Sequence, residues 1–126
     1  MIFGLGTDIA EIVRVAEVYE STGDGFVDRI LTEEEKQKIP KNPALIPAYL
    51  AKRFAVKEAA AKALGTGINK GVSFLDFTTT HNELGAPSLV VTGKAAEIAA
   101  SEGIHTWHVS ISDEKHYAVA TVITEK

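Results

Sequence analysis

Glu58 and Lys62 lie four residues apart in the segment 53–67, RFAVKEAAAKALGTG, which reads as one helix ending in a glycine-framed turn. With Lys57 they place three charges on an alanine-rich helix whose backbone could approach an anionic ligand closely. Residues four apart share a helix face. The simplest structural interpretation is therefore a surface ion pair between Glu58 and Lys62, which would stabilise the helix by about 0.2–0.5 kcal/mol. In the functional interpretation, Glu58 holds a metal ion or accepts a proton and Lys62 neutralises a phosphate.

The turn Gly65–Thr66–Gly67 could present backbone N–H groups to a phosphate. Gly65 is equally well explained as the C-terminal cap of the helix. The helix dipole is negative at this end, which disfavours an anion. Phosphate binding here would therefore rely on Lys62, on the loop amides or on a bound cation.

Asp8 follows a glycine-rich apolar segment, and its side chain could act as a helix N-cap or as a metal ligand. Asp8 and Glu58 are fifty residues apart, so spacing alone cannot pair them. Two carboxylates, completed by phosphate oxygens and waters, would suit Mg²⁺. His108 is expected on the polar face of a strand beside Ser110, where a structural and a ligand-binding role are both open.

The surrounding elements are expected to form one α+β domain, residues 1–126, with helices packed on a mostly antiparallel sheet. Thr32 with Glu35 has the form of a capping box, and so does Asp8 with Glu11. Periodicity and turn signals predict strands at 2–5, 72–80, 88–92, 106–112 and 117–124, and helices at 9–19, 32–40, 48–64 and 94–102.

The composition limits the classes of function. A net charge of -4 gives no electrostatic case for binding nucleic acid, and the absence of cysteine excludes thiolate metal sites and a cysteine nucleophile. Hydrophobic residues make up 45% and charged residues 24% of the chain, as in ordinary globular proteins. Neither a signal peptide nor a membrane-spanning run is evident, so we expect a soluble, cytoplasmic protein without membrane partners.

Four blocks of the sequence, in this order and separation, resemble the holo-acyl carrier protein synthases of the 4'-phosphopantetheinyl transferase superfamily. The early Asp-Ile motif together with the later KEAxxK motif is the specific part of the resemblance. The blocks are GLGTDIAEIVR (4–14), AKRFAVKEAAAKALGTGI (51–68), ELGAP (83–87) and HVSISDEKHYAVATVI (108–123).

The resemblance implies transfer of 4'-phosphopantetheine from coenzyme A to a serine of apo-acyl carrier protein, releasing adenosine 3',5'-bisphosphate, a reaction of fatty acid and lipid biosynthesis. It implies Mg²⁺ held by Asp8 and Glu58, a phosphate-contacting Lys62, and a homotrimer with active sites at subunit clefts. Asp8, Glu58 and Lys62 would be the catalytic residues, the serine proton passing to Glu58 or to a metal-bound water. By the same resemblance, coenzyme A would be bound by Arg53, Lys62, Gly65, Gly85, Pro87 and His108, and the carrier protein by Arg14.

One departure from the family pattern concerns docking. Carrier proteins are acidic, yet the segment around Arg14 also carries Glu11, Glu17 and Glu20.

Two other functions stay open. The chain could be a non-catalytic module that binds carrier proteins, or another Mg²⁺-dependent enzyme that cleaves a pyrophosphate.

Overall fold

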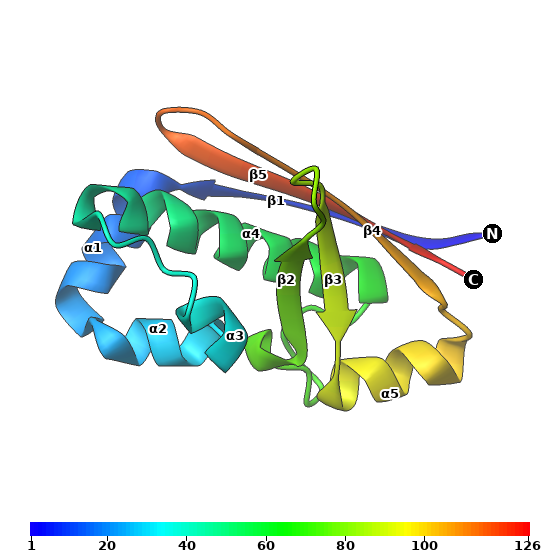
Figure 1. Ribbon diagram of the computed structural model, residues 1–126. Helices are drawn as coiled ribbons and strands as arrows, with labels where there is room; N and C mark the ends of the chain where they lie inside the picture. Colours follow the sequence, from blue (N-terminus) through cyan, green and yellow to red (C-terminus); the bar gives the residue numbers. More distant parts are fainter.

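The computed structural model describes all residues, 1–126, and places one long helix at the centre of the molecule (Figure 1). The elements in chain order are β1 (Ile2–Glu11), α1 (Ile12–Thr22), α2 (Asp24–Ile30), α3 (Glu33–Lys36), the 3-10 turn η1 (Pro43–Leu45), α4 (Ile46–Leu64), the 3-10 turn η2 (Phe74–Asp76), β2 (Phe77–His81), β3 (Pro87–Val91), α5 (Gly93–Glu102), β4 (Thr106–Asp113) and β5 (Tyr117–Glu125).

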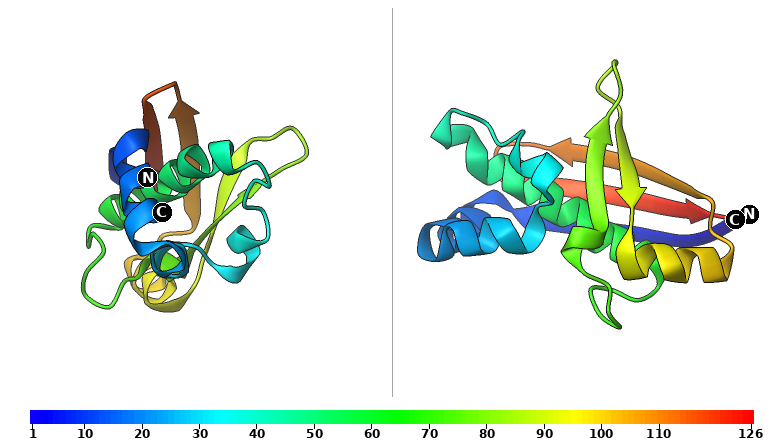
Figure 2. Two further views of the ribbon diagram at one scale, coloured as in Figure 1. Left: turned by 90° about the vertical axis from the view of Figure 1, so that its left-hand side faces the viewer. Right: turned by 60° about the horizontal axis from the view of Figure 1, so that its bottom comes forward.

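The central helix α4 is covered by two antiparallel sheets, as the views of Figures 1 and 2 show. One sheet has the strand order β1-β5-β4, and the other is the hairpin β2-β3, which crosses α4 and projects beyond it. Helices α1 to α3 gather at one end of α4 and α5 lies near the other. The expected α+β architecture is confirmed, with two sheets instead of one.

Helix α4 forms and ends as expected from its residues. Alanine is the strongest helix former, and the buried alanines keep the surface of the helix slim. Gly65 ends the helix in the left-handed conformation, with φ of 93°, and its N–H donates to the carbonyl of Ala61. The helix is therefore a thin, buried rod against which a strand can pack closely.

Two glycines let β1 lie directly against the backbone of α4. A Cβ on Gly4 would stand 2.1 Å from the carbonyl oxygen of Ala63, and one on Gly6 would stand 1.9 Å from that of Ala59. Any side chain at these two positions would push the strand away. This close packing brings Asp8 beside the C-terminal half of α4.

The sheet register separates a packed face from an open face. Ala118, Ala120 and Val122 of β5 are buried against the core, whereas Leu5 and Ile9 of β1 are 65% and 62% exposed on the opposite face. The predicted alternation in β4 is confirmed: its apolar positions are half-buried, and its His and Ser positions are exposed. The outer face of the three-stranded sheet is thus partly apolar.

The predicted helix starting at Ile9 with Asp8 as its cap is wrong. Strand β1 continues to Glu11, and Asp8 lies within it, opposite Ala120 of β5. Cross-strand hydrogen bonds satisfy the backbone here, so the local capping pattern is not used. Helix α1 begins only at Ile12.

The other differences concern element boundaries. Helix α2 was not predicted, and the predicted strand 72–80 is divided into η2 and β2, because Ser73 and Asp76 form a capping box. The capping box of Thr32 and Glu35 is present as predicted, although α3 ends at Lys36, before Pro40.

No helix has the length and apolar character needed to cross a membrane.

Candidate active site

Asp8 and Lys62 meet where β1 packs on α4. The ammonium group of Lys62 lies 3.2 Å from Oδ1 of Asp8 and donates to the carbonyl oxygen of Thr7 at 2.9 Å. Glu58 is one turn earlier on the same helix face and forms no ion pair of its own. The surface ion pair between Glu58 and Lys62 is therefore not formed. The lysine bridges to a residue fifty-four positions away.

The charge of Asp8 influences the carboxyl of Glu58. Burial raises the pKa of the Glu58 carboxyl, and the nearby charge of Asp8 raises it further. The ammonium of Lys62 acts in the opposite direction. Two carboxylates that share the influence of one lysine leave local negative charge, which a further cation would relieve.

These two carboxylates could supply part of the ligand set of a magnesium ion. The structure has no group of three or more His, Cys, Asp or Glu side chains that could hold a metal ion. Asp8 and Glu58 supply the hard oxygen donors that Mg²⁺ prefers, and Mg²⁺ usually keeps several waters or substrate phosphates as ligands. A ligand with phosphate oxygens would complete such a site.

The Gly65 turn does not offer its amides to a ligand. The N–H groups of Gly65, Thr66 and Gly67 donate to the carbonyl of Ala61 at 3.2, 3.2 and 3.1 Å. These hydrogen bonds close the end of α4. A phosphate near this turn would have to be contacted by Lys62, three residues before Gly65.

A second, basic pocket lies between the N-terminal half of α4, the tip of the hairpin and the end of β4. Its volume is about 240 Å³. It brings together Arg53, Gly85 and Pro87, which were predicted to bind coenzyme A, and adds residues that the sequence analysis did not select. The lining is Tyr49, Lys52, Arg53, His81, Gly85, Pro87, Ile111 and Asp113.

Arg53 is the central cation of this basic pocket. Its residue is 6% exposed, its guanidinium stacks on the Tyr49 ring at 4.5 Å, and its Nε has no hydrogen-bond partner. Burial lowers the pKa of His81, and the positive charges of Arg53, Lys38 and Lys52 lower it further. The pocket is thus positively charged in an otherwise acidic chain, as an anion site requires.

Lys57 does not face a ligand, contrary to the interpretation of the charged trio. It is fully buried, and its ammonium donates to the carboxylate of Glu35 and to the carbonyl of Ile30. Burial lowers the pKa of Lys57, and Glu35 opposes this shift. The capping box predicted Glu35 only as a local feature of α3, so no sequence signal linked it to Lys57.

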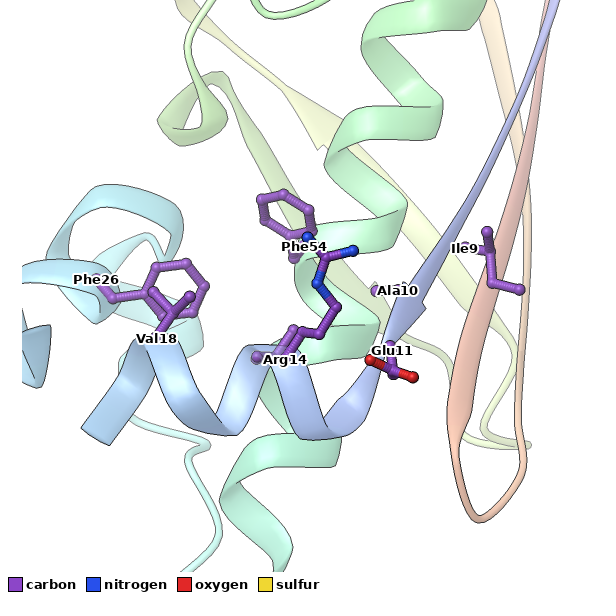
Figure 3. A pocket seen from close by; sticks show the side chains of 8 residues that line it. Ile9, Ala10, Glu11, Arg14, Val18, Phe26 and Phe54 are labelled. Carbon is purple, nitrogen blue, oxygen red and sulfur yellow. The ribbon is translucent and has the colours of Figure 1, made fainter. Parts of the chain in front are cut away.

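Arg14 borders an apolar pocket between β1, α1, α2 and α4 (Figure 3). The pocket has a volume of about 300 Å³. Figure 3 shows the Arg14 side chain rising from α1 toward Phe54 of α4, with Val18 and Phe26 beside them. Six of the eight lining residues are hydrophobic, so the pocket suits an apolar side chain next to a cation.

His108 joins neither group of residues in the single chain. It lies on the exposed outer face of the three-stranded sheet, where its Nε2 is 2.8 Å from a carboxylate oxygen of Glu125. The pairing with His108 lowers the pKa of Glu125. The predicted ligand role of His108 therefore depends on a molecule or subunit that covers this face.

Comparison with known proteins gives consistent matches over the whole chain. A model of the 4'-phosphopantetheinyl transferase superfamily matches residues 4–122. The chain is 57% identical over 124 residues to a holo-acyl-carrier-protein synthase from Vibrio campbellii and 56% identical over 124 residues to one from Photobacterium profundum, with 98% of each chain covered in both cases.

Solved structures of the same kind have the same fold. The crystal structure of a holo-acyl-carrier-protein synthase from Neisseria meningitidis matches with a TM-score of 0.91 at 42% identity, covering 100% of both chains. That from Helicobacter pylori, in complex with coenzyme A, matches with a TM-score of 0.84 at 29% identity, covering 96% of this chain and 99% of that one.

Proposed function

The chain belongs to the 4'-phosphopantetheinyl transferase superfamily, and we infer that it transfers the 4'-phosphopantetheine group of coenzyme A to a serine of apo-acyl carrier protein. Adenosine 3',5'-bisphosphate is the other product. The observation that carries the chemistry is the contact of Lys62 with Asp8 beside Glu58. Two acids and a lysine are suited to a reaction at a pyrophosphate.

We propose that Asp8 and Glu58 hold Mg²⁺, which when bound neutralises charge on the pyrophosphate oxygens. The serine hydroxyl attacks the phosphorus on the pantetheine side, and the bond from that phosphorus to the bridging oxygen breaks. Lys62, held at the site by Asp8 and the Thr7 carbonyl, stabilises the negative charge on the departing oxygen.

Glu58 is the better placed of the two acids to accept the serine proton. Asp8 is paired with Lys62, whereas Glu58 has no ion-pair partner. We therefore assign proton removal to Glu58, in preference to a bound water.

The basic pocket is proposed to hold the adenosine bisphosphate end of coenzyme A. Its cations, Lys52 and Arg53, suit the phosphates at that end, and Gly85 and Pro87 form the opposite wall. Arg53 and Lys57 share one face of α4, however, while Glu58 and Lys62 share a face about 140° further round the helix. One chain alone therefore does not bring the basic pocket and the carboxylates onto the same face of α4.

A homotrimer with sites at its subunit clefts would join these two half-sites. The outer face of the three-stranded sheet is the surface we propose for self-association, because Leu5 and Ile9 are largely exposed there. His108 is on the same face, and Gly65 is at the exposed end of α4. Both could then contact coenzyme A bound by a neighbouring subunit.

The carrier protein is proposed to dock on α1, with Arg14 contacting its acidic surface and the apolar pocket accepting a hydrophobic side chain. Glu17 and Glu20 outnumber Arg14 on α1, and Glu11 directly precedes the helix, so this surface is negatively charged overall. We therefore expect the apolar contact to supply most of the affinity and Arg14 the orientation.

The reaction is tested by intact-mass measurement of an apo-acyl carrier protein after incubation with this protein, coenzyme A and Mg²⁺, with and without chelator. The expected result is the gain of one phosphopantetheine group, which the chelator abolishes. Binding of the carrier without a gain in mass would indicate a docking module. Release of the nucleotide without any acceptor would indicate a hydrolase.

A further inference from the structure

A buried group of three charged side chains links α3, α4 and the hairpin. Glu35 and Lys57 are 1% and 0% exposed, and the Lys57 ammonium donates to Oε1 of Glu35. The other oxygen, Oε2, accepts from the N–H of Thr79 in β2 at 2.9 Å. Oε2 also lies 3.9 Å from Nε of Arg53. The site described above does not use Glu35 or Lys57.

Arg53 lies beside Glu35 but forms no hydrogen bond with it. At 3.9 Å its Nε is too far from Glu35 for a hydrogen bond, and that atom has no other partner. A lone buried carboxylate would draw the nearest guanidinium into a close, forked ion pair. Here the nearer cation is Lys57, so Arg53 can stay stacked on Tyr49 at the edge of the basic pocket.

The same carboxylate also aligns the opposite wall of the pocket. Thr79 belongs to β2, and its strand leads through His81 to the hairpin tip that carries Gly85 and Pro87. Tyr49, which supports Arg53, donates its hydroxyl proton to the backbone carbonyl of Glu35 at 2.6 Å. Glu35 thus contacts both sides of the pocket, while Lys57 neutralises its negative charge.

We propose that Lys57 is a positioning residue: it takes up the negative charge of Glu35 and so leaves Arg53 free to bind the anionic end of coenzyme A. This inference rests on the proposed function of the basic pocket. Lys57 would act only through Arg53 and would not touch the substrate. A purely structural role predicts loss of stability on removing Lys57, but unchanged ligand binding in a Lys57→Met chain that stays folded.

The test measures binding of adenosine 3',5'-bisphosphate by calorimetry to the wild-type chain, Lys57→Met, and Lys57→Met with Glu35→Gln. In Lys57→Met the unpaired Glu35 should capture Arg53 and weaken binding about tenfold or more, the loss expected for a hydrogen bond to a charged group. The double variant removes the competing charge and should bind within about threefold of wild type. Lys94→Met, an exposed lysine on α5, is the matched control and should bind like wild type.

Circular dichroism checks that each variant is folded. A folded Lys57→Met that binds as well as wild type would overturn the inference, and so would a double variant that binds as weakly as Lys57→Met. If Lys57→Met does not fold, the double variant decides: binding within about threefold of wild type supports the proposal, and lost binding overturns it. Failure of the proposed function is a separate result, seen when the wild-type chain leaves the mass of apo-carrier protein unchanged.

Discussion

Asp8, Glu58 and Lys62 concentrate two negative charges and one positive charge at the contact of a strand with a helix. Lys62 is shared between the Asp8 carboxylate and the Thr7 carbonyl, which fixes its ammonium in place. Glu58 is left without an ion-pair partner. At this scale the proposed chemistry depends on an excess of negative charge. A bound cation would balance this charge, and phosphate oxygens would complete the ligands of the cation.

Removing either acid should abolish transfer without unfolding the chain. In Asp8→Asn and Glu58→Gln we expect activity to fall by about 100–1000-fold, by analogy with the loss of one group that stabilises charge in a transition state. Intact-mass assays of the carrier protein measure this loss. Glu97→Gln, at an exposed acid on α5, is the control and should keep full activity. Near-normal turnover of either site variant would contradict the metal assignment.

The raised pKa of Glu58 predicts that its ionised carboxylate lowers the free energy of unfolding of the metal-free protein as the pH rises. Because the folded state favours the protonated carboxyl, Glu58 stabilises the fold below its ordinary pKa of 4.5 and loses that contribution as the pH rises through its folded pKa. With chelator present, Glu58→Gln should therefore melt higher than wild type at about pH 8 and close to it at about pH 4.

Thermal denaturation at the two pH values checks this prediction, and added Mg²⁺ should raise the melting temperature of wild type more than that of Glu58→Gln. A difference between the two proteins that is the same at both pH values would show that Glu58 carries no unfavourable charge in the folded state.

At the scale of elements, the site depends on how closely β1 approaches α4. Gly4 and Gly6 leave no space for a side chain against the carbonyls of Ala63 and Ala59. The same approach positions Asp8 two residues further along the strand. The glycines near the N-terminus thus serve packing, and the position of Asp8 beside α4 follows from that packing.

Gly6→Ala should force β1 away from α4 and cost about 1–3 kcal/mol of unfolding free energy, since overpacking of a core is destabilising. Transfer activity should fall as well, because Asp8 moves with the strand. Gly25→Ala is the matched control: nothing lies within 4 Å of a Cβ built there, and we expect a change of at most about 1 kcal/mol. Urea denaturation measures both, and equal stability of the two variants would contradict the close contact.

At the scale of the whole molecule, the chain presents two half-sites and an uncovered apolar sheet face. The basic pocket and the carboxylates lie on different faces of α4, and His108 is on the far side of the sheet. Self-association through the outer face would bury Leu5 and Ile9. Assembly and catalysis should therefore be lost together.

Leu5→Glu places a charge on this outer face and should raise the concentration for half-dissociation about tenfold or more, as for a residue worth over 1 kcal/mol in an interface. Sedimentation at micromolar concentration checks it, with transfer activity measured in parallel. Leu75→Glu, at an exposed leucine in η2, should leave the assembly unchanged. A wild-type chain that sediments only as a monomer would contradict the shared clefts.

The sequence alone determined the features that depend on neighbouring residues. The end of α4 at Gly65, the Thr32–Glu35 capping box, the two faces of β4 and the end of α5 at Gly103 all follow from local backbone preferences and side-chain periodicity. The motif pattern also indicated the family, because the order and separation of several blocks carry that information.

Only the tertiary structure decided which distant charges meet. Asp8 matched a helix cap locally but became a strand residue, because pairing with β5 satisfies its backbone. Lys57 appeared to belong to a ligand site, but it is buried and paired with Glu35. Lys62 pairs with Asp8 and not with its helix neighbour Glu58. Such pairings depend on the packing of elements that are far apart in the chain, and spacing within the sequence does not contain that geometry.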